Sequence, residues 1–209
     1  MRTLAWPLRR RCRRGYLLVF TLSAAIWPWG PAEAVANPPK SRLTAVDLKI
    51  CKRIAIQKQG GHKDGGAWRC PGLPGYPVYF AEGDLRQMLA FGSDGERRRS
   101  ASQTLGPFNT IFEGKVRPTI EWRVAPDAKG QDRPYATIVR YHISRDGEKG
   151  EALVITKVNT EVSCQLAVVD ATANENAIAV AREWADANAR ALPCPQEPVV
   201  LGRSGKGPL

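Results

Sequence analysis

The sequence has few of the residues and motifs on which common catalytic sites depend. Only two of its 209 residues are histidine, His62 and His142, so a catalytic triad or a multi-histidine zinc site is hard to build. There is no Walker phosphate loop, no GxSxG turn and no HExxH motif. None of the five cysteines has CxxC spacing, which argues against a redox or zinc role. We therefore expect no metal and no cofactor.

The chain also lacks an apolar run long enough to span a membrane. Its longest candidate, Tyr16–Trp27, has about twelve residues, whereas a spanning helix needs about 20. An arginine-rich stretch precedes this run, and the small-x-small site Ala34-Val35-Ala36 follows it. This order predicts a signal peptide over 1–36, cleaved after about Ala36, and a periplasmic or secreted protein with no membrane span after cleavage. An uncleaved anchor is the alternative, and Arg13-Arg14 leaves twin-arginine export open beside general secretion.

Almost half of the net positive charge belongs to the predicted signal peptide. The whole chain carries 31 Lys and Arg against 20 Asp and Glu, a formal net charge of +11. Without residues 1–36 it keeps 25 basic and 19 acidic residues, a net charge of about +6. An anionic envelope component or another periplasmic protein is therefore a reasonable partner. Because the sequence contains no nucleic-acid-binding module, we expect no nucleic acid among its partners.

The four cysteines that follow the signal peptide are expected to form structural disulfides. An oxidising compartment favours such bonds, and free thiols or metal ligands are the alternative. Four cysteines allow three pairings. The most local pairing joins Cys51 to Cys70 and Cys164 to Cys194, and this is the pairing we expect.

The organisation of the chain predicts one domain with flexible ends. We expect a flexible segment over 37–47, a single domain over 48–194 and a disordered tail over 195–209, because both ends are polar and rich in proline or glycine. Short strands separated by glycine fill the first half of the domain. The capping box Ser93–Glu96 predicts a helix over about 96–105.

The second half shows clearer strand and helix patterns. Alternation and β-branched residues predict an antiparallel meander of four strands, at 119–124, 136–143, 152–158 and 164–169. Asn174 is expected to cap a final helix over about 175–192. Its sheet-facing side would carry Ala177, Val180, Ala181, Trp184, Ala187 and Ala191, and its solvent side Arg182, Asp186 and Arg190. The sequence thus predicts an α+β fold, an antiparallel sheet packed by a C-terminal helix.

Two groups of polar residues are candidate sites. If strands 119–124 and 136–143 are neighbours, Glu121, Arg123, Arg140 and His142 project from one face of the sheet, where paired guanidinium groups suit an anionic ligand. An outward-facing charged surface is the alternative.

Glu82 and Asp84 form the second group, which would serve general acid/base chemistry on a glycan. The competing interpretation is a turn held by a contact between Asp84 and Arg86. We therefore favour a non-enzymatic binding or envelope-associated protein, with a small hydrolase of envelope polymers as the alternative.

Several segments together resemble a family of exported bacterial proteins with no assigned function. The resemblance covers roughly residues 48–194, and it rests on Trp68-Arg69-Cys70-Pro71-Gly72, Gly75-Tyr76-Pro77-Val78-Tyr79, Glu82-Gly83-Asp84-Leu85-Arg86, Glu121-Trp122-Arg123, Cys164 with Val169-Asp170-Ala171, and Ala185-Asp186 before Cys194. It implies export and disulfides, and it carries over no catalytic residue.

Overall fold

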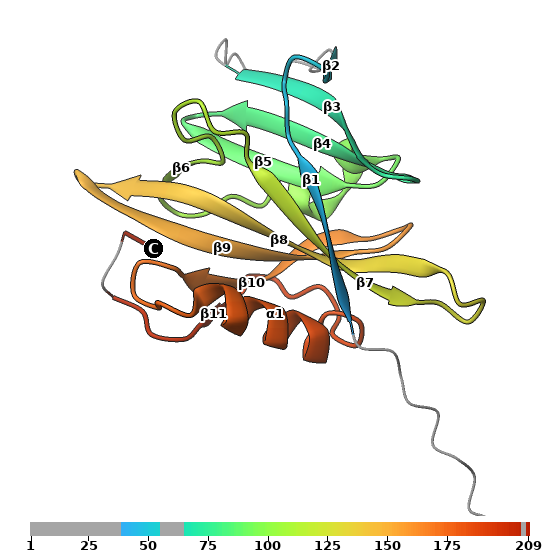
Figure 1. Cartoon of the computed structure of the whole chain (residues 1–209). Helices are drawn as coiled ribbons and strands as arrows, with labels where there is room; N and C mark the ends of the chain where they lie inside the picture. Colours follow the sequence, from blue (N-terminus) through green and yellow to red (C-terminus); the bar gives the residue numbers. More distant parts are fainter. Residues whose placement is uncertain (1–38, 55–64, 206–207) are drawn as a thin grey trace, which may run out of the picture. The chain divides into compact units, whose positions relative to one another are not determined.

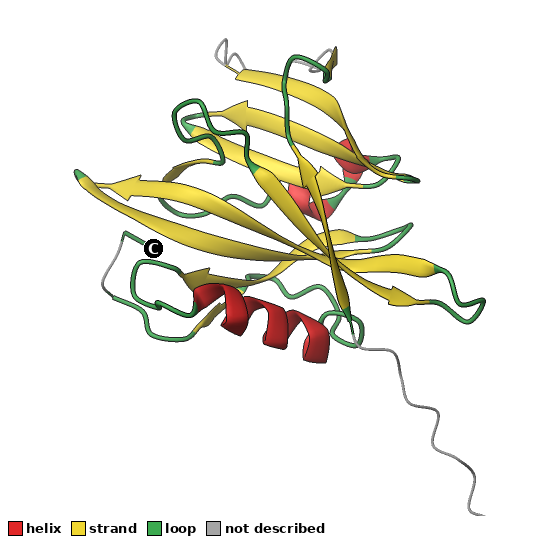
Figure 2. Ribbon diagram, in the orientation of Figure 1, coloured by secondary structure: helices red, strands yellow, loops and turns green. Residues whose placement is uncertain are grey.

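The computed structural model describes residues 39–54, 65–205 and 208–209, which form two sheets and one α-helix (Figures 1 and 2). The predicted signal peptide and His62 lie outside the described residues. A four-stranded sheet packs on one face of a seven-stranded sheet, and helix α1 (Ala177–Asn188) packs on the other. No helix among the described residues is long and apolar enough to cross a membrane.

The large sheet is built around the predicted antiparallel meander. Its strands β7, β8, β9 and β10 pair in chain order, which confirms that part of the prediction. Strand β1 adds to β7 antiparallel, and β11 adds to β10 parallel. Strand β6 pairs with the C-terminal part of β8, beyond the residues of β8 that pair with β7. The bounds are Lys40–Ala45 (β1), Phe108–Thr110 (β6), Thr119–Pro126 (β7), Asp132–Arg145 (β8), Glu148–Val158 (β9), Ser163–Asp170 (β10) and Val199–Leu201 (β11).

The small sheet is an antiparallel meander of consecutive strands, tied to the preceding segment by a disulfide. The strands are β2 (Lys52–Ile54), β3 (Gly65–Leu73), β4 (Tyr76–Gly83) and β5 (Arg86–Phe91). Cys51 is bonded to Cys70, and Cys164 to Cys194, as the local pairing predicted. The first bond ties the start of the small sheet to β3, and the second ties β10 to the chain beyond α1.

Apolar side chains of the two sheets meet in an aromatic core. Ile120, Trp122 and Val124 of β7 are at most 1% exposed, and they face the small sheet as their alternation indicated. The Phe91 ring lies edge-on to Trp122 at 5.2 Å between centroids, and Tyr76 does so at 6.5 Å. Such large buried side chains provide much of the hydrophobic stabilisation of a fold of this size.

The helix packs closely on the opposite face through small residues, and this face agrees in part with the predicted one. Four of the predicted residues pack against the apolar cluster there: Ala177, Val180, Ala181 and Trp184. Its buried residues are Ala177, Ala181 and Ala185, followed by Ala189 just beyond its end, whereas Ala187 is exposed. The helix is also shorter than expected, and the residue at its start is Asn176, whose side chain makes no capping hydrogen bond. The expected cap, Asn174, bonds the Asp170 and Arg203 carbonyls instead. The buried face differs from the predicted one because Arg182 and Asp186, which were expected in solvent, bind the sheet residues Glu121 and Arg123.

Three further expectations are corrected. The fold is mostly β rather than α+β, since one α-helix accompanies eleven strands in the described residues. The predicted helix at 96–105 is replaced by two 3-10 turns, Gly95–Arg97 and Arg99–Ala101, and the predicted cap makes no side-chain bond. Buried Ser100 bonds the Ser163 hydroxyl instead, so a tertiary contact overrides a local signal in a serine-rich stretch. The segments expected to be flexible or disordered contain strands β1 and β11. Neighbouring residues gave no sign of these strands, because the strands that they pair with, β7 and β10, are distant in sequence.

Candidate functional site

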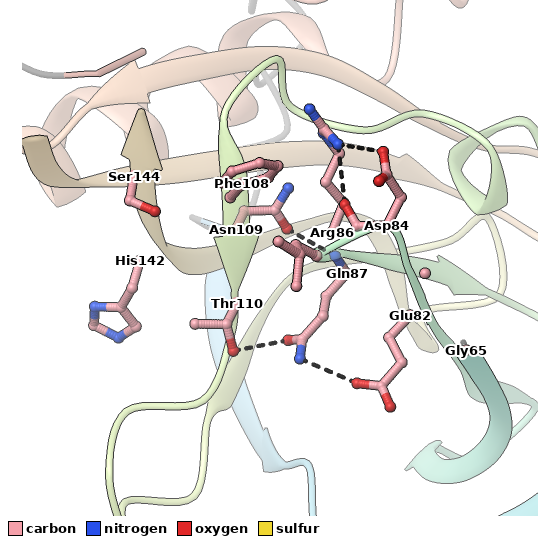
Figure 3. Close-up of a pocket in the computed structure, with 12 residues that line it drawn as sticks. Gly65, Glu82, Asp84, Arg86, Gln87, Phe108, Asn109, Thr110, His142 and Ser144 are labelled. Atoms are coloured by element: carbon pink, nitrogen blue, oxygen red, sulfur yellow. Dashed lines mark hydrogen bonds and ion pairs between the residues drawn. The ribbon is translucent and has the colours of Figure 1, made fainter. Parts of the chain in front are cut away.

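A cavity of about 700 Å³ opens where the turn between β4 and β5 approaches β6 and the end of β8. We call it the hairpin cleft (Figure 3). Its size lies within the range of ordinary ligand pockets. It is lined by Gly65, Glu82, Gly83, Asp84, Leu85, Arg86, Gln87, Phe108, Asn109, Thr110, His142 and Ser144.

The turn at the edge of the cleft holds an unusual backbone conformation. Gly83 pairs with Arg86, so only Asp84 and Leu85 connect the strands, and both have positive φ, 51° and 57°. A two-residue hairpin with a type I′ turn requires this geometry and normally uses Asn-Gly. A leucine there costs roughly 1–2 kcal/mol, and its 71% exposed side chain recovers little burial energy. The Leu85 carbonyl accepts a hydrogen bond from the Asn109 amide, which holds the turn against β6.

Gln87 organises the floor of the cleft. Its side-chain oxygen accepts hydrogen bonds from the Thr110 hydroxyl at 3.1 Å and the Ile111 amide at 2.7 Å. Its amide nitrogen donates to Glu82 over 3.5 Å, a weak bond at that length. Figure 3 shows this chain of contacts from Glu82 through Gln87 to Thr110. The Glu82 carboxylate therefore faces the cleft without a charged partner among the described residues.

The second carboxylate, Asp84, is held by an ion pair on the outside of the turn. Arg86 donates to its Oδ2 at 2.6 Å, which confirms the interpretation of a turn held by an Asp–Arg contact. The same guanidinium bonds the Gly106 carbonyl and stacks 5.1 Å from the Phe108 ring centroid. The Asp84 side chain is 87% exposed and Phe108 is 44% exposed. The edge of the cleft thus combines two exposed apolar side chains with acidic groups.

His142 and Ser144 enter the cleft from β8 (Figure 3). The imidazole lies between two carboxylates, 3.6 Å from Glu113 and 3.5 Å from Glu151. No cluster of three or more metal-ligating side chains occurs among the described residues. The cleft therefore brings together one predicted ligand residue, His142, and both residues of the predicted acid pair, Glu82 and Asp84.

The four predicted ligand residues do share one face of the large sheet, but helix α1 covers two of them. Arg123 donates two hydrogen bonds to Asp186, at 2.8 and 2.6 Å, and Arg182 donates two to Glu121, at 2.7 and 3.0 Å. Ser41 of β1 bonds both Glu121 and Arg123. We call these five residues, together with Tyr135, the helix-docking network. Arg140 lies beyond the helix, where it pairs with Glu151.

Burial and pairing act in opposite directions on the carboxylates of this network. Burial is the largest influence on Asp186 and would raise its pKa. Hydrogen bonds from Arg123 and Tyr135, with the guanidinium charge, outweigh it and lower the pKa below its ordinary value. Glu121 behaves in the same way, with Arg182 and Ser41 as its partners. Burial has the largest effect on Tyr135 and raises its pKa, and the hydrogen bond to the Asp186 carboxylate raises it further. The carboxylates and guanidinium groups of the network stay charged at neutral pH. Glu121 and Arg123 are therefore used to hold α1 on the sheet.

Sequence reasoning identified the acidic turn but not the backbone strain at Leu85. The signal was present, because a two-residue connection with no glycine at either position is unusual between two β runs. No family model, curated protein or solved structure matches the chain. The resemblance to exported bacterial proteins therefore stays an expectation.

Proposed function

We propose that this chain is an exported, non-enzymatic binding protein that contacts a partner protein through the hairpin cleft. The two disulfides are compatible with a periplasmic or extracellular location, because such bonds persist in oxidising compartments. The compartment itself rests on the predicted signal peptide.

The observation that carries the proposal is the exposed Leu85. A bulky residue in the left-handed region is unfavourable, and a glycine or asparagine would serve the turn better. Backbone strain of this kind concentrates at functional sites, where the side chain is needed for something other than folding. Leu85 and Phe108 are both exposed on the same cleft, so together they offer an apolar anchor.

The charges around the anchor indicate the kind of partner. Glu82 has no charged partner among the described residues, and Asp84 is exposed on the outside of the turn. Arg86 is already engaged by Asp84 and by the Gly106 carbonyl. The partner surface should therefore present an apolar pocket for Leu85 beside a lysine or arginine.

Leu85→Gly separates binding from folding. We expect this variant to be as stable as the wild type or up to about 1 kcal/mol more stable, because the strain is removed. We also expect it to bind the partner at least tenfold more weakly. The measurements are urea denaturation, quantitative retention of envelope proteins on each immobilised variant, and a titration of the purified retained protein.

Val116→Gly is the matched control. Val116 is 69% exposed but lies away from the hairpin cleft, so its loss should leave partner binding unchanged. Equal partner affinity of Leu85→Gly and wild type would refute the proposal. So would a loss of stability in Leu85→Gly, because Leu85 would then be a structural residue.

A hydrolase of envelope polymers is the second candidate, favoured by the convergence of Glu82, Asp84, His142 and Ser144 on one cleft. Against it, catalytic acids are usually held away from water, whereas Asp84 is 87% exposed and paired with Arg86. Turnover of purified peptidoglycan that is lost in Asp84→Asn would support the hydrolase. Protein binding without turnover supports the binding protein.

A further inference from the structure

A second cavity, of about 360 Å³, lies on the helix side of the large sheet. We call it the helix-side groove. Its floor is apolar, since Ile138 and Leu153 are 3% and 2% exposed, and Ile178 of α1 forms one wall. Leu43 of β1 and Val116 stand at its edge with 65% and 69% of their surface exposed. Two large apolar side chains left in water beside an apolar floor mark a surface that something else covers.

Guanidinium groups surround this apolar surface. Arg140, Arg182 and Arg117 line the groove, against the carboxylates of Glu113 and Glu121. Glu121 is only 8% exposed, and its two oxygens accept hydrogen bonds from Arg182, so this pair adds little charge of either sign toward the groove. Arg117 is likewise paired, with Asp47. Among the described residues, Arg140 uses one nitrogen, to bond Glu151, and keeps its other donors. Arg140 is therefore the residue of the groove that can bond an anionic group.

The beginning of α1 adds to this preference. Ile178 stands in its first turn, which contains no acidic residue and has no side-chain cap. The amides of Ala177, Ala179 and Val180 bond backbone carbonyls there, and the aligned peptide dipoles of the helix still place partial positive charge at this end. This field has the same sign as that of Arg140, and both act on the same cavity.

We propose that the helix-side groove binds a single-chain anionic amphiphile, a carboxylate with an aliphatic chain of the fatty-acid type. The chain lies on Ile138, Leu153 and Ile178 and is covered by Leu43 and Val116. The carboxylate bonds Arg140. A cavity of 360 Å³ is near the lower limit for ligand pockets, which suits one acyl chain and excludes a two-chain lipid. This site shares only His142 with the lining of the hairpin cleft, and it does not depend on the function proposed for that cleft.

Dodecanoate is the probe, studied by calorimetry below its micelle concentration with acetate and dodecanol as comparison ligands. We expect dodecanoate to bind more tightly than dodecanol and acetate not to bind, because both the chain and the charge contribute. Arg140→Gln should weaken binding about tenfold, the value of one charge-assisted hydrogen bond. Val116→Asp should weaken binding at least tenfold, because it places a charge against the chain.

Matched controls separate the groove from general effects. Arg133 is 52% exposed and paired with Asp127, much as Arg140 is 46% exposed and paired with Glu151, so Arg133→Gln should bind normally. Ile50 is 64% exposed outside the groove, so Ile50→Asp should also bind normally. Leu85→Gly should keep dodecanoate binding, which distinguishes this site from the hairpin cleft.

Three outcomes would overturn the proposal. The first is no saturable binding of dodecanoate to the folded wild type. The second is equal binding by Arg140→Gln, Val116→Asp and their controls. The third is binding to phosphatidylglycerol vesicles without binding to free dodecanoate, because the surface would then recognise a membrane. Thermal unfolding of each variant confirms that it is folded before its binding is compared.

Discussion

The two faces of the large sheet are covered in different ways. On one face, large aromatic and aliphatic side chains fill the space between two sheets, with Trp122 completely buried. On the other, alanines bring α1 close to the sheet, and ion pairs of the helix-docking network fix its position. The small sheet covers one face of the large sheet through apolar packing, whereas α1 leaves part of the other face open. The helix-side groove lies in the uncovered part.

The comparison predicts the largest loss of stability on the aromatic side. Trp122→Ala should lower the free energy of unfolding by about 3–5 kcal/mol, because it opens a cavity among Phe91, Tyr76 and their neighbours. Trp184→Ala, at a half-buried position of α1, should cost clearly less. Urea denaturation with both disulfides intact measures the two values. Equal losses would mean that the two faces contribute alike.

A smaller loss is expected when the helix-docking network is broken. Arg123→Met should cost roughly 3 kcal/mol, because it leaves Asp186 and Ser41 without their partner near the sheet. Adding Asp186→Leu should recover part of this loss, since a buried pair replaced by apolar side chains is often tolerated. The double-mutant cycle gives the coupling energy. Coupling near zero would contradict the role of the network in docking α1.

The smallest effect expected is a dependence on pH that arises from the helix-docking network. The pKa values of Asp186 and Glu121 are lowered in the folded protein, so their contribution to stability is present above their ordinary pKa values of about 4. It is lost as the pH falls through the still lower folded values. Denaturation between pH 6 and pH 2.5 should therefore show a steeper loss for the wild type than for the Arg123→Met, Asp186→Leu variant. Parallel curves would exclude Asp186 as the source.

Local patterns predicted the parts of the fold in which the deciding contacts are near in sequence. Alternation in β7 placed Trp122 and Arg123 on opposite faces, and the short connections predicted the meander from β7 to β10. The patterns failed where a distant partner decides. The Lys40–Ala45 strand is polar and forms only because β7 offers it a free edge, about 80 residues away.

The candidate site divides in the same way. The acidic turn and its Asp84–Arg86 contact were foreseen, because both residues lie within one hairpin. Nothing local shows that β6 and His142 complete a cleft around that turn. The charged face with Glu121, Arg123, Arg140 and His142 was also foreseen, but which of these residues remain accessible depends on where α1 lies.

The sequence by itself determined the alternation of the central strands, the segment that becomes the helix and the scarcity of catalytic motifs, because these follow from neighbouring residues and from composition. The two disulfides it favoured without excluding other pairings. The tertiary structure alone decided which charges are neutralised, that Arg182 and Asp186 of α1 bind the sheet, and where Leu85 and the apolar groove are left exposed. The physical reason is that a hydrogen bond or a buried contact between distant segments exists only after the chain has folded.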